Sequence, residues 1–129
     1  MSIIVKLLFV GGQPKGEDEP FSSKTHSGKI LRRIVKELKY LYEIEVGYYD
    51  IWRSAEEERR GILLPAERSV LLQNLKEGKH LIALGHHVHR ALQKAAIPVD
   101  YFPHPARDSK RLREMLEADI AVSIFQQSP

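Results

Sequence analysis

The stretch that decides the fold is residues 9–18, which read FVGGQPKGED. It follows an apolar run over residues 3–10 and comes before a helical pattern. An apolar strand that runs into a Gly/Pro-rich turn and then a helix is how open α/β sheets present backbone groups to a ligand. Gly11 and Gly12 permit a sharp bend and a close approach to the backbone, and Pro14 stiffens the turn. The pattern fits a ligand-binding turn at the carboxyl end of a strand, and it also fits a plain tight connection.

Composition places the chain among globular proteins. With 129 residues, 43% of them hydrophobic and 29% charged, it is long enough for one core, and we expect a single domain over residues 1–129. The absence of cysteine excludes disulfides, thiol catalysis, zinc–cysteine sites and iron–sulfur clusters. Because no apolar run approaches the length of a membrane span and no signal peptide is recognisable, we expect a cytoplasmic protein without a membrane partner.

The apolar periodicity predicts alternating strands and helices. Strands are expected over residues 3–10, 44–51, 80–84 and 98–102. Helices are expected over residues 27–42, with Ser27 as N-cap, 65–78, with Val70, Leu71 and Leu75 facing the core, 86–96 and 107–119. Residues 53–60 are expected to form a loop, and residues 120–125 either an edge strand or a cover over the core.

This alternation predicts an α/β three-layer sandwich, with a central four-stranded, mostly parallel sheet flanked by helices. The unbroken apolar character of residues 3–10 is typical of a central strand buried on both faces. Because crossovers between parallel strands are right-handed, Gln13, Asp50 and His104 should meet at the same edge of the sheet.

Two groups of motifs resemble those of the uracil-DNA glycosylase superfamily, most closely its family 4 type. The first group is the turn of residues 10–18 with Pro20-Phe21 and residues 27–31, SGKIL. The second is residues 82–85, IALG, with Val88, Ala91-Leu92 and then His104-Pro105-Ala106. The order and spacing of these motifs cover most of the chain, so the resemblance implies a uracil-DNA glycosylase-like fold.

The resemblance also implies a role for each matching residue. Phe21 matches the aromatic residue that stacks on the extruded base, and His104 matches the histidine that stabilises negative charge on the departing base. The turn of residues 11–14 matches the loop that holds the attacking water. Asp50 falls near the position at which relatives use asparagine to read the Watson–Crick edge.

The departures from the family 4 pattern are equally specific. Gly12 replaces the motif glutamate, Gln13 replaces the neighbouring alanine, and Lys15 replaces the glycine after the proline. The four cysteines that hold the family 4 iron–sulfur cluster are missing. We therefore expect a minimal relative without a cofactor.

The residue types limit the chemistry. Gln13 can orient a water molecule but cannot accept its proton. The candidate bases are Asp18 and Glu17, the nearest carboxylates, and Asp50. The acidic run around Asp18 also fits a solvated loop. An ionised Asp50 in the pocket would favour an exocyclic amino group over O4 of uracil. Phe21 fits a loop anchor as well as a stacking platform, and His104 fits a loop histidine that caps carbonyl groups.

Basic residues near the same edge fit contacts with DNA phosphates, and they also fit ordinary solvated helix faces. The candidates for the DNA backbone are Lys15, Lys24, Lys29, Arg107, Lys110 and Arg111. The spacing of His86, His87 and His89 is possible for metal ligands, but no cysteine or carboxylate completes the set, so we expect no metal there.

The motifs favour hydrolysis of the N-glycosidic bond of a flipped base, with uracil as the first candidate, in single- or double-stranded DNA during base-excision repair. One alternative is a weak or inactive relative that binds DNA or a nucleotide. Another is a different nucleotide-binding α/β protein. The oligomeric state stays open at this stage.

Overall fold

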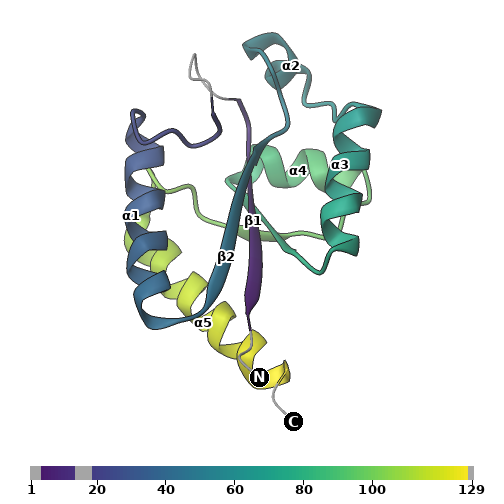
Figure 1. Cartoon of the computed structure of the whole chain (residues 1–129). Helices are drawn as coiled ribbons and strands as arrows, with labels where there is room; N and C mark the ends of the chain where they lie inside the picture. The colour runs from purple at the N-terminus through teal and green to yellow at the C-terminus, as the bar shows by residue number, and fades with distance from the viewer. Residues whose placement is uncertain (1–3, 14–18, 128–129) are drawn as a thin grey trace.

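A computed structural model of the chain describes residues 4–13 and 19–127, and it contains a parallel sheet covered by helices (Figure 1). The strands are β1 (Val5–Gly11), β2 (Ile44–Asp50), β3 (His80–Leu84) and β4 (Asp100–Phe102). The helices are α1 (His26–Leu41), α2 (Ala55–Arg60), α3 (Pro65–Lys76), α4 (His86–Lys94) and α5 (Ser109–Gln127).

The sheet has the strand order β2-β1-β3-β4, and every neighbouring pair is parallel. This confirms the predicted four-stranded α/β sheet and the central position of the first strand. In the register, Gly11 lies opposite Asp50 of β2, and Val10 lies opposite Ala83 of β3. The carboxyl ends of the strands therefore reach one edge together.

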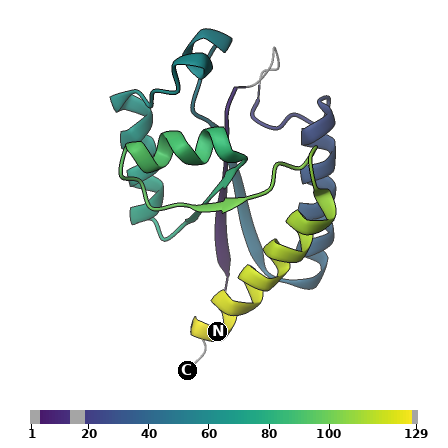
Figure 2. The ribbon, with the colours of Figure 1, turned by 180° about the vertical axis from the view of Figure 1, so that it is seen from behind.

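The two faces of β1 are covered by different helices. Val5, Leu7 and Phe9 belong to a buried cluster with α1 and α5, whereas Leu8 and Val10 belong to a second cluster with α3 and α4. Figures 1 and 2 show α1 and α5 on one side of the sheet and α3 and α4 on the other. Because successive strand residues point to opposite faces, this alternation produces the predicted three-layer sandwich.

Helix α2 lies where the sequence predicted a loop over residues 53–60, so that prediction is wrong. Ser54 caps the helix by accepting a hydrogen bond from the Glu57 backbone N–H at 3.2 Å. Gly61 ends it in the left-handed conformation, with φ of 63°. Acidic residues in the first turn and arginines in the last turn complement the helix dipole. The two caps and these charges stabilise α2, although it has no buried residue.

Helix α1 begins before the expected N-cap Ser27. The Thr25 side chain accepts a hydrogen bond from the Gly28 N–H at 3.0 Å and donates one to the Ser22 carbonyl at 2.8 Å. Thr25 thus caps the helix and at the same time ties it to the preceding loop.

Residues 120–125 continue α5 and do not form an edge strand. Ile120 is buried in the cluster with α1, and Ile124 packs partly against it, so this segment covers the core, which was the alternative prediction.

In α3, Leu71 is buried and Leu75 partly so, but Val70 is exposed, contrary to the prediction that it faces the core. Among the described residues, no helix combines the length and the apolar character needed to cross a bilayer.

Gly28 provides a test of how α1 packs on this loop. A Cβ atom there would lie 1.9 Å from the Ser22 carbonyl oxygen and 2.6 Å from that of Phe21. Alanine usually stabilises a helix by about 1 kcal/mol relative to glycine. We expect the opposite for Gly28→Ala, a loss of roughly 1–3 kcal/mol or more in urea-induced unfolding, because the backbone must move. The exposed neighbour variant Lys29→Ala should change stability by less than about 0.5 kcal/mol, and a stabilising Gly28→Ala would contradict this packing.

Candidate functional site

A cavity of about 360 Å³ opens at the carboxyl edge of the sheet. Its walls come from the ends of β1, β2 and β3, the segment after β4, helix α2, and the first turns of α1 and α4. The residues that line it are Gly11, Gly12, Gln13, Phe21, Thr25, Ser27, Asp50, Glu58, Leu84, Gly85, His86, His87, Val88, His104 and Arg107. The predicted meeting of Gln13, Asp50 and His104 at one edge is therefore confirmed.

The Gly11-Gly12 turn is fixed by backbone pairing that continues beyond the strands. The Ile51 N–H donates to the Gly11 carbonyl at 3.1 Å, and the Trp52 N–H donates to the Gly12 carbonyl at 2.8 Å. These bonds extend the β1–β2 ladder past Gly11 and Asp50. The turn is therefore held as rigidly as a strand, which is what a binding site needs.

Glu58 is a site residue that the sequence reasoning missed. The Gln13 side-chain amide donates to Glu58 Oε2 at 2.8 Å. A Cβ atom on Gly12 would lie 2.9 Å from Glu58 Oε1, so the carboxylate lies directly against the turn. Glu58 comes from α2, and two signals in the sequence could have revealed that helix, the capping pattern Ser54 to Glu57 and the glycine at position 61.

Contacts with Trp52 and His87 hold helix α2 in place and so set the position of Glu58. Trp52 is 1% exposed, and its indole N–H donates to the Ile62 carbonyl at 3.1 Å. The Trp52 ring lies 4.8 Å from the His87 ring, measured between centroids. His87 Nε2 lies 2.6 Å from the Glu58 carbonyl oxygen, which gives α2 a contact with the start of α4.

Phe21 combines the two roles that the sequence left open. The residue is 9% exposed and belongs to the core, so the loop-anchor interpretation holds, but it also lines the cavity. Its φ of 49° is unusual for a bulky residue. Arg32 holds this conformation, because its guanidinium donates to the carbonyls of Phe21 at 2.6 Å and Pro20 at 3.1 Å.

Tyr48 completes the support for the aromatic wall. Its ring centroid lies 5.9 Å from that of Phe9 and 6.2 Å from that of Phe21, and the Arg32 guanidinium lies 4.3 Å above it. Burial raises the pKa of Tyr48, although the Arg32 charge acts in the other direction. The phenol is therefore neutral at ordinary pH and serves as packing.

Asp50 and Phe21 approach each other across Gly11. A Cβ atom on Gly11 would lie 2.6 Å from the Phe21 ring and 2.8 Å from Asp50 Oδ1. An aromatic face and a carboxylate oxygen are thus brought to the same small volume. Only glycine leaves room for both, which gives a steric reason for the glycine at this position.

His104 lies across the cavity, next to Gly85. The Gly85 N–H donates to the Phe102 carbonyl at 3.1 Å, so the chain reaches His104 from a fixed strand end. His104 Nδ1 accepts a hydrogen bond from the Ala106 N–H at 3.2 Å. Because a nitrogen that accepts cannot carry a proton, the neutral ring is protonated on Nε2 and is a donor there.

The predicted DNA-contacting residues that the structure describes, all of the set except Lys15, are exposed and cluster around two helix starts. Lys24 and Lys29 flank the beginning of α1, and Arg107, Lys110 and Arg111 flank the beginning of α5. Arg107 lines the cavity itself. Lys110 lines a groove that it shares with the first residue of α1, so the two basic helix starts are neighbours.

Some predicted positions fall elsewhere. Pro14, Lys15 and Asp18 lie outside the described residues. Of the α4 histidines, His86 forms a hydrogen bond of 2.9 Å with the Tyr101 hydroxyl, and His87 contacts α2 as described above. Among residues 4–13 and 19–127, the side chains with metal-ligand spacing are a different set, at the opposite edge of the sheet.

No protein-family model, curated protein or solved structure matches this chain. The functional assignment therefore depends on the motifs and on the geometry of the cavity.

The two glycines of the turn should respond differently to substitution. In Gly12→Ala the new Cβ meets the mobile end of Glu58, so we expect a stability loss below about 1 kcal/mol and a changed emission of Trp52, the single tryptophan. In Gly11→Ala it meets the buried Phe21 ring, and the loss should be roughly 1–3 kcal/mol. Urea unfolding and fluorescence measure both effects. Equal losses in the two variants would contradict the described arrangement of the turn.

Proposed function

We propose that this protein is a DNA glycosylase-type hydrolase that cleaves the N-glycosidic bond of a base flipped out of DNA, with uracil as the first candidate base. The observation that carries the proposal is the convergence of three distant segments on one cavity, the β1–α1 loop with Gln13 and Phe21, the end of β2 with Asp50, and the segment after β4 with His104. Phe21 and His104 match functional positions of the glycosylase motifs, Gln13 lies in the turn that matches the water-holding loop, and Asp50 falls near the position that reads the base edge. The proposal places the protein in base-excision repair.

The cavity suits a single nucleobase. Its volume of about 360 Å³ falls at the small end of the range for ligand pockets, roughly 300–1,000 Å³. The Phe21 ring offers a flat apolar surface, and stacking of a base on an aromatic ring contributes about 1–3 kcal/mol. Asp50 lies beside that ring and would meet the polar edge of a stacked base.

Gln13 and Glu58 supply a place for the attacking water. The Gln13 amide donates to Glu58, which fixes the orientation of its own carbonyl oxygen as a water acceptor. The Glu58 carboxylate takes the proton as the water oxygen bonds to the sugar C1′. The C1′–N bond breaks in the same process, and its electron pair leaves with the base.

His104 acts on the departing base. The negative charge that develops there is delocalised onto the base oxygens, and a donor fixed beside them lowers the barrier. The Nε2–H of the neutral ring is such a donor, because Nδ1 is engaged by the Ala106 N–H. The neighbouring prolines at 103 and 105 restrict the backbone of this segment.

The basic helix starts offer a path for the DNA strand. Arg107 lies in the cavity wall, and Lys29 and Lys110 extend the positive charge along the ends of α1 and α5. Helix N-termini add partial positive charge for phosphate groups. This arrangement favours single- or double-stranded DNA over a free base as the bound form.

The proposal is tested with uracil-containing single- and double-stranded oligonucleotides, followed by alkali and strand separation. The wild-type protein should produce breaks at uracil. His104→Ala should lower the rate about 10²–10³-fold, and Glu58→Gln about 10²–10⁴-fold, because each removes a group that acts in the transition state. His89→Ala, at a histidine of α4 outside both the cavity wall and the groove of the basic helix starts, is the matched control and should keep full activity.

Two results would count against the hydrolase. Absence of breaks, together with salt-sensitive retardation of DNA on a gel, would select a relative that binds DNA without hydrolysing it. Absence of both would leave the α/β protein without a nucleic-acid role. Full activity of His104→Ala would contradict the role given to this residue.

Asp50 should determine which base the protein excises preferentially. An ionised carboxylate accepts hydrogen bonds, so it favours a base edge with an amino group over one with O4. Asp50→Asn should raise the excision rate for uracil relative to an amino-bearing base such as 5-methylcytosine, by about 10-fold for one hydrogen bond of about 1.4 kcal/mol. Competition assays with both substrates measure the ratio. An unchanged ratio would show that Asp50 does not read the base.

A further inference from the structure

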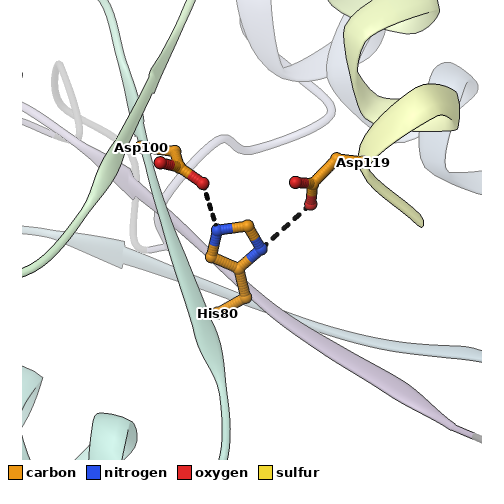
Figure 3. A group of neighbouring side chains, drawn as sticks. All are labelled: His80, Asp100 and Asp119. Carbon is orange, nitrogen blue, oxygen red and sulfur yellow. Dashed lines mark hydrogen bonds and ion pairs between the residues drawn. The ribbon is translucent and has the colours of Figure 1, made fainter. Parts of the chain in front are cut away.

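A second polar group lies at the opposite, amino edge of the sheet. His80 begins β3, Asp100 begins β4, and Asp119 lies in α5. Figure 3 shows the His80 ring between the two carboxylates, which approach it from different elements. The group shares no residue with the cavity at the carboxyl edge, and the proposed glycosylase chemistry does not use it.

The distances bring three potential ligand atoms together. His80 Nε2 lies 2.5 Å from Asp100 Oδ2, and His80 Nδ1 lies 2.9 Å from Asp119 Oδ2. One ligand atom from each of the three residues can be chosen so that all lie within 4.8 Å of one another. Tetrahedral donors at about 2.1 Å from a zinc ion are about 3.4 Å apart, so the three ligand atoms must draw closer, and the ring must turn, for an ion to bind.

The charges in this group favour a cation. Within the described ranges, neither Asp100 nor Asp119 forms an ion pair with a lysine or arginine, so two carboxylates face one imidazole. Asp119 Oδ2 is buried and has no hydrogen-bond donor of good geometry there. Interaction with the two carboxylates, Asp119 first, raises the pKa of His80, although burial of the ring opposes this. Protons therefore compete with a metal ion for His80, because the imidazole must be neutral to bind the ion.

The group also has access to solvent. It borders a hollow of about 520 Å³ that Lys6, Glu77 and Gln126 help to line. The Lys6 ammonium opposes a cation in this hollow, while the Glu77 carboxylate favours one. An ion bound here could complete its coordination with water, which a closed site would not allow.

We propose that His80, Asp100 and Asp119 form a binding site for a divalent transition-metal ion of the zinc class. One imidazole nitrogen and one oxygen from each aspartate are the ligands, a mixed set that suits Zn²⁺ better than the oxygen-only preference of Mg²⁺. Because the two carboxylates face different ring nitrogens, the imidazole must turn to present one nitrogen to the ion. The other nitrogen can keep a carboxylate as its hydrogen-bond partner, as metal-bound histidines commonly do.

The test uses the full chain without a histidine tag, freed of metal by chelator and titrated with ZnCl₂ in a calorimeter at about pH 8, where protons compete least. We expect one ion per chain and, at 100-fold excess over Kd, a rise of roughly 5–10 °C in the unfolding midpoint. His80→Gln and Asp119→Asn should each weaken binding at least about 10-fold. His89→Gln is the matched control, because it removes a histidine of the rival group in α4, and it should bind as the wild type does.

A second measurement keeps the result clear if a variant folds poorly. Co²⁺ in the wild-type site should give visible absorption bands that Zn²⁺ abolishes in a one-to-one titration. Absence of saturable binding would overturn the proposal and leave His80 as a bridge between two carboxylates. Binding that survives His80→Gln, or that is lost in His89→Gln, would overturn it too, and in the second case would assign the ion to α4.

Discussion

The burial of β1 on both faces is the constraint from which the rest of the structure follows. The segment Leu7–Val10 of this strand is apolar and buried between two helical layers, so polar side chains lie only near the ends of the strand. At the carboxyl end, Gly11 and Gly12 let the chain leave the sheet while their carbonyls still accept hydrogen bonds from Ile51 and Trp52. Parallel pairing brings the neighbouring strands to the same edge, and the cavity forms there.

The sheet and four of the five helices could be predicted because their signals are local. Apolar periodicity and flanking glycines fix a strand or a long helix within its own segment. Helix α2 escaped because six charged and small residues carry no apolar period, although its caps were visible in Ser54 and Gly61. The contact between Gln13 and Glu58 escaped for a different reason. It joins positions 45 residues apart, and no local pattern encodes it.

The Glu58 carboxylate occupies the space that a side chain at position 12 would need. A Cβ atom on Gly12 would lie 2.9 Å from Glu58 Oε1, so a side chain there would displace the carboxylate. The volume beside the turn therefore holds one acidic side chain, supplied either by the turn or by α2. This gives a steric reason for glycine at position 12, next to a cavity wall that already holds the carboxylate of Glu58.

The two ends of the sheet are also connected through β4. This strand has three residues and pairs only with β3 among the described strands, so its ladder alone restrains it weakly. Its first residue, Asp100, and Asp119 of α5 are both held by the ring of His80, and His104 lies between them in the sequence. The segment that carries His104 is thus fixed on both sides by one side chain of the neighbouring strand. The contacts of His80 at the amino edge therefore restrain both elements that flank the segment leading into the cavity at the carboxyl edge.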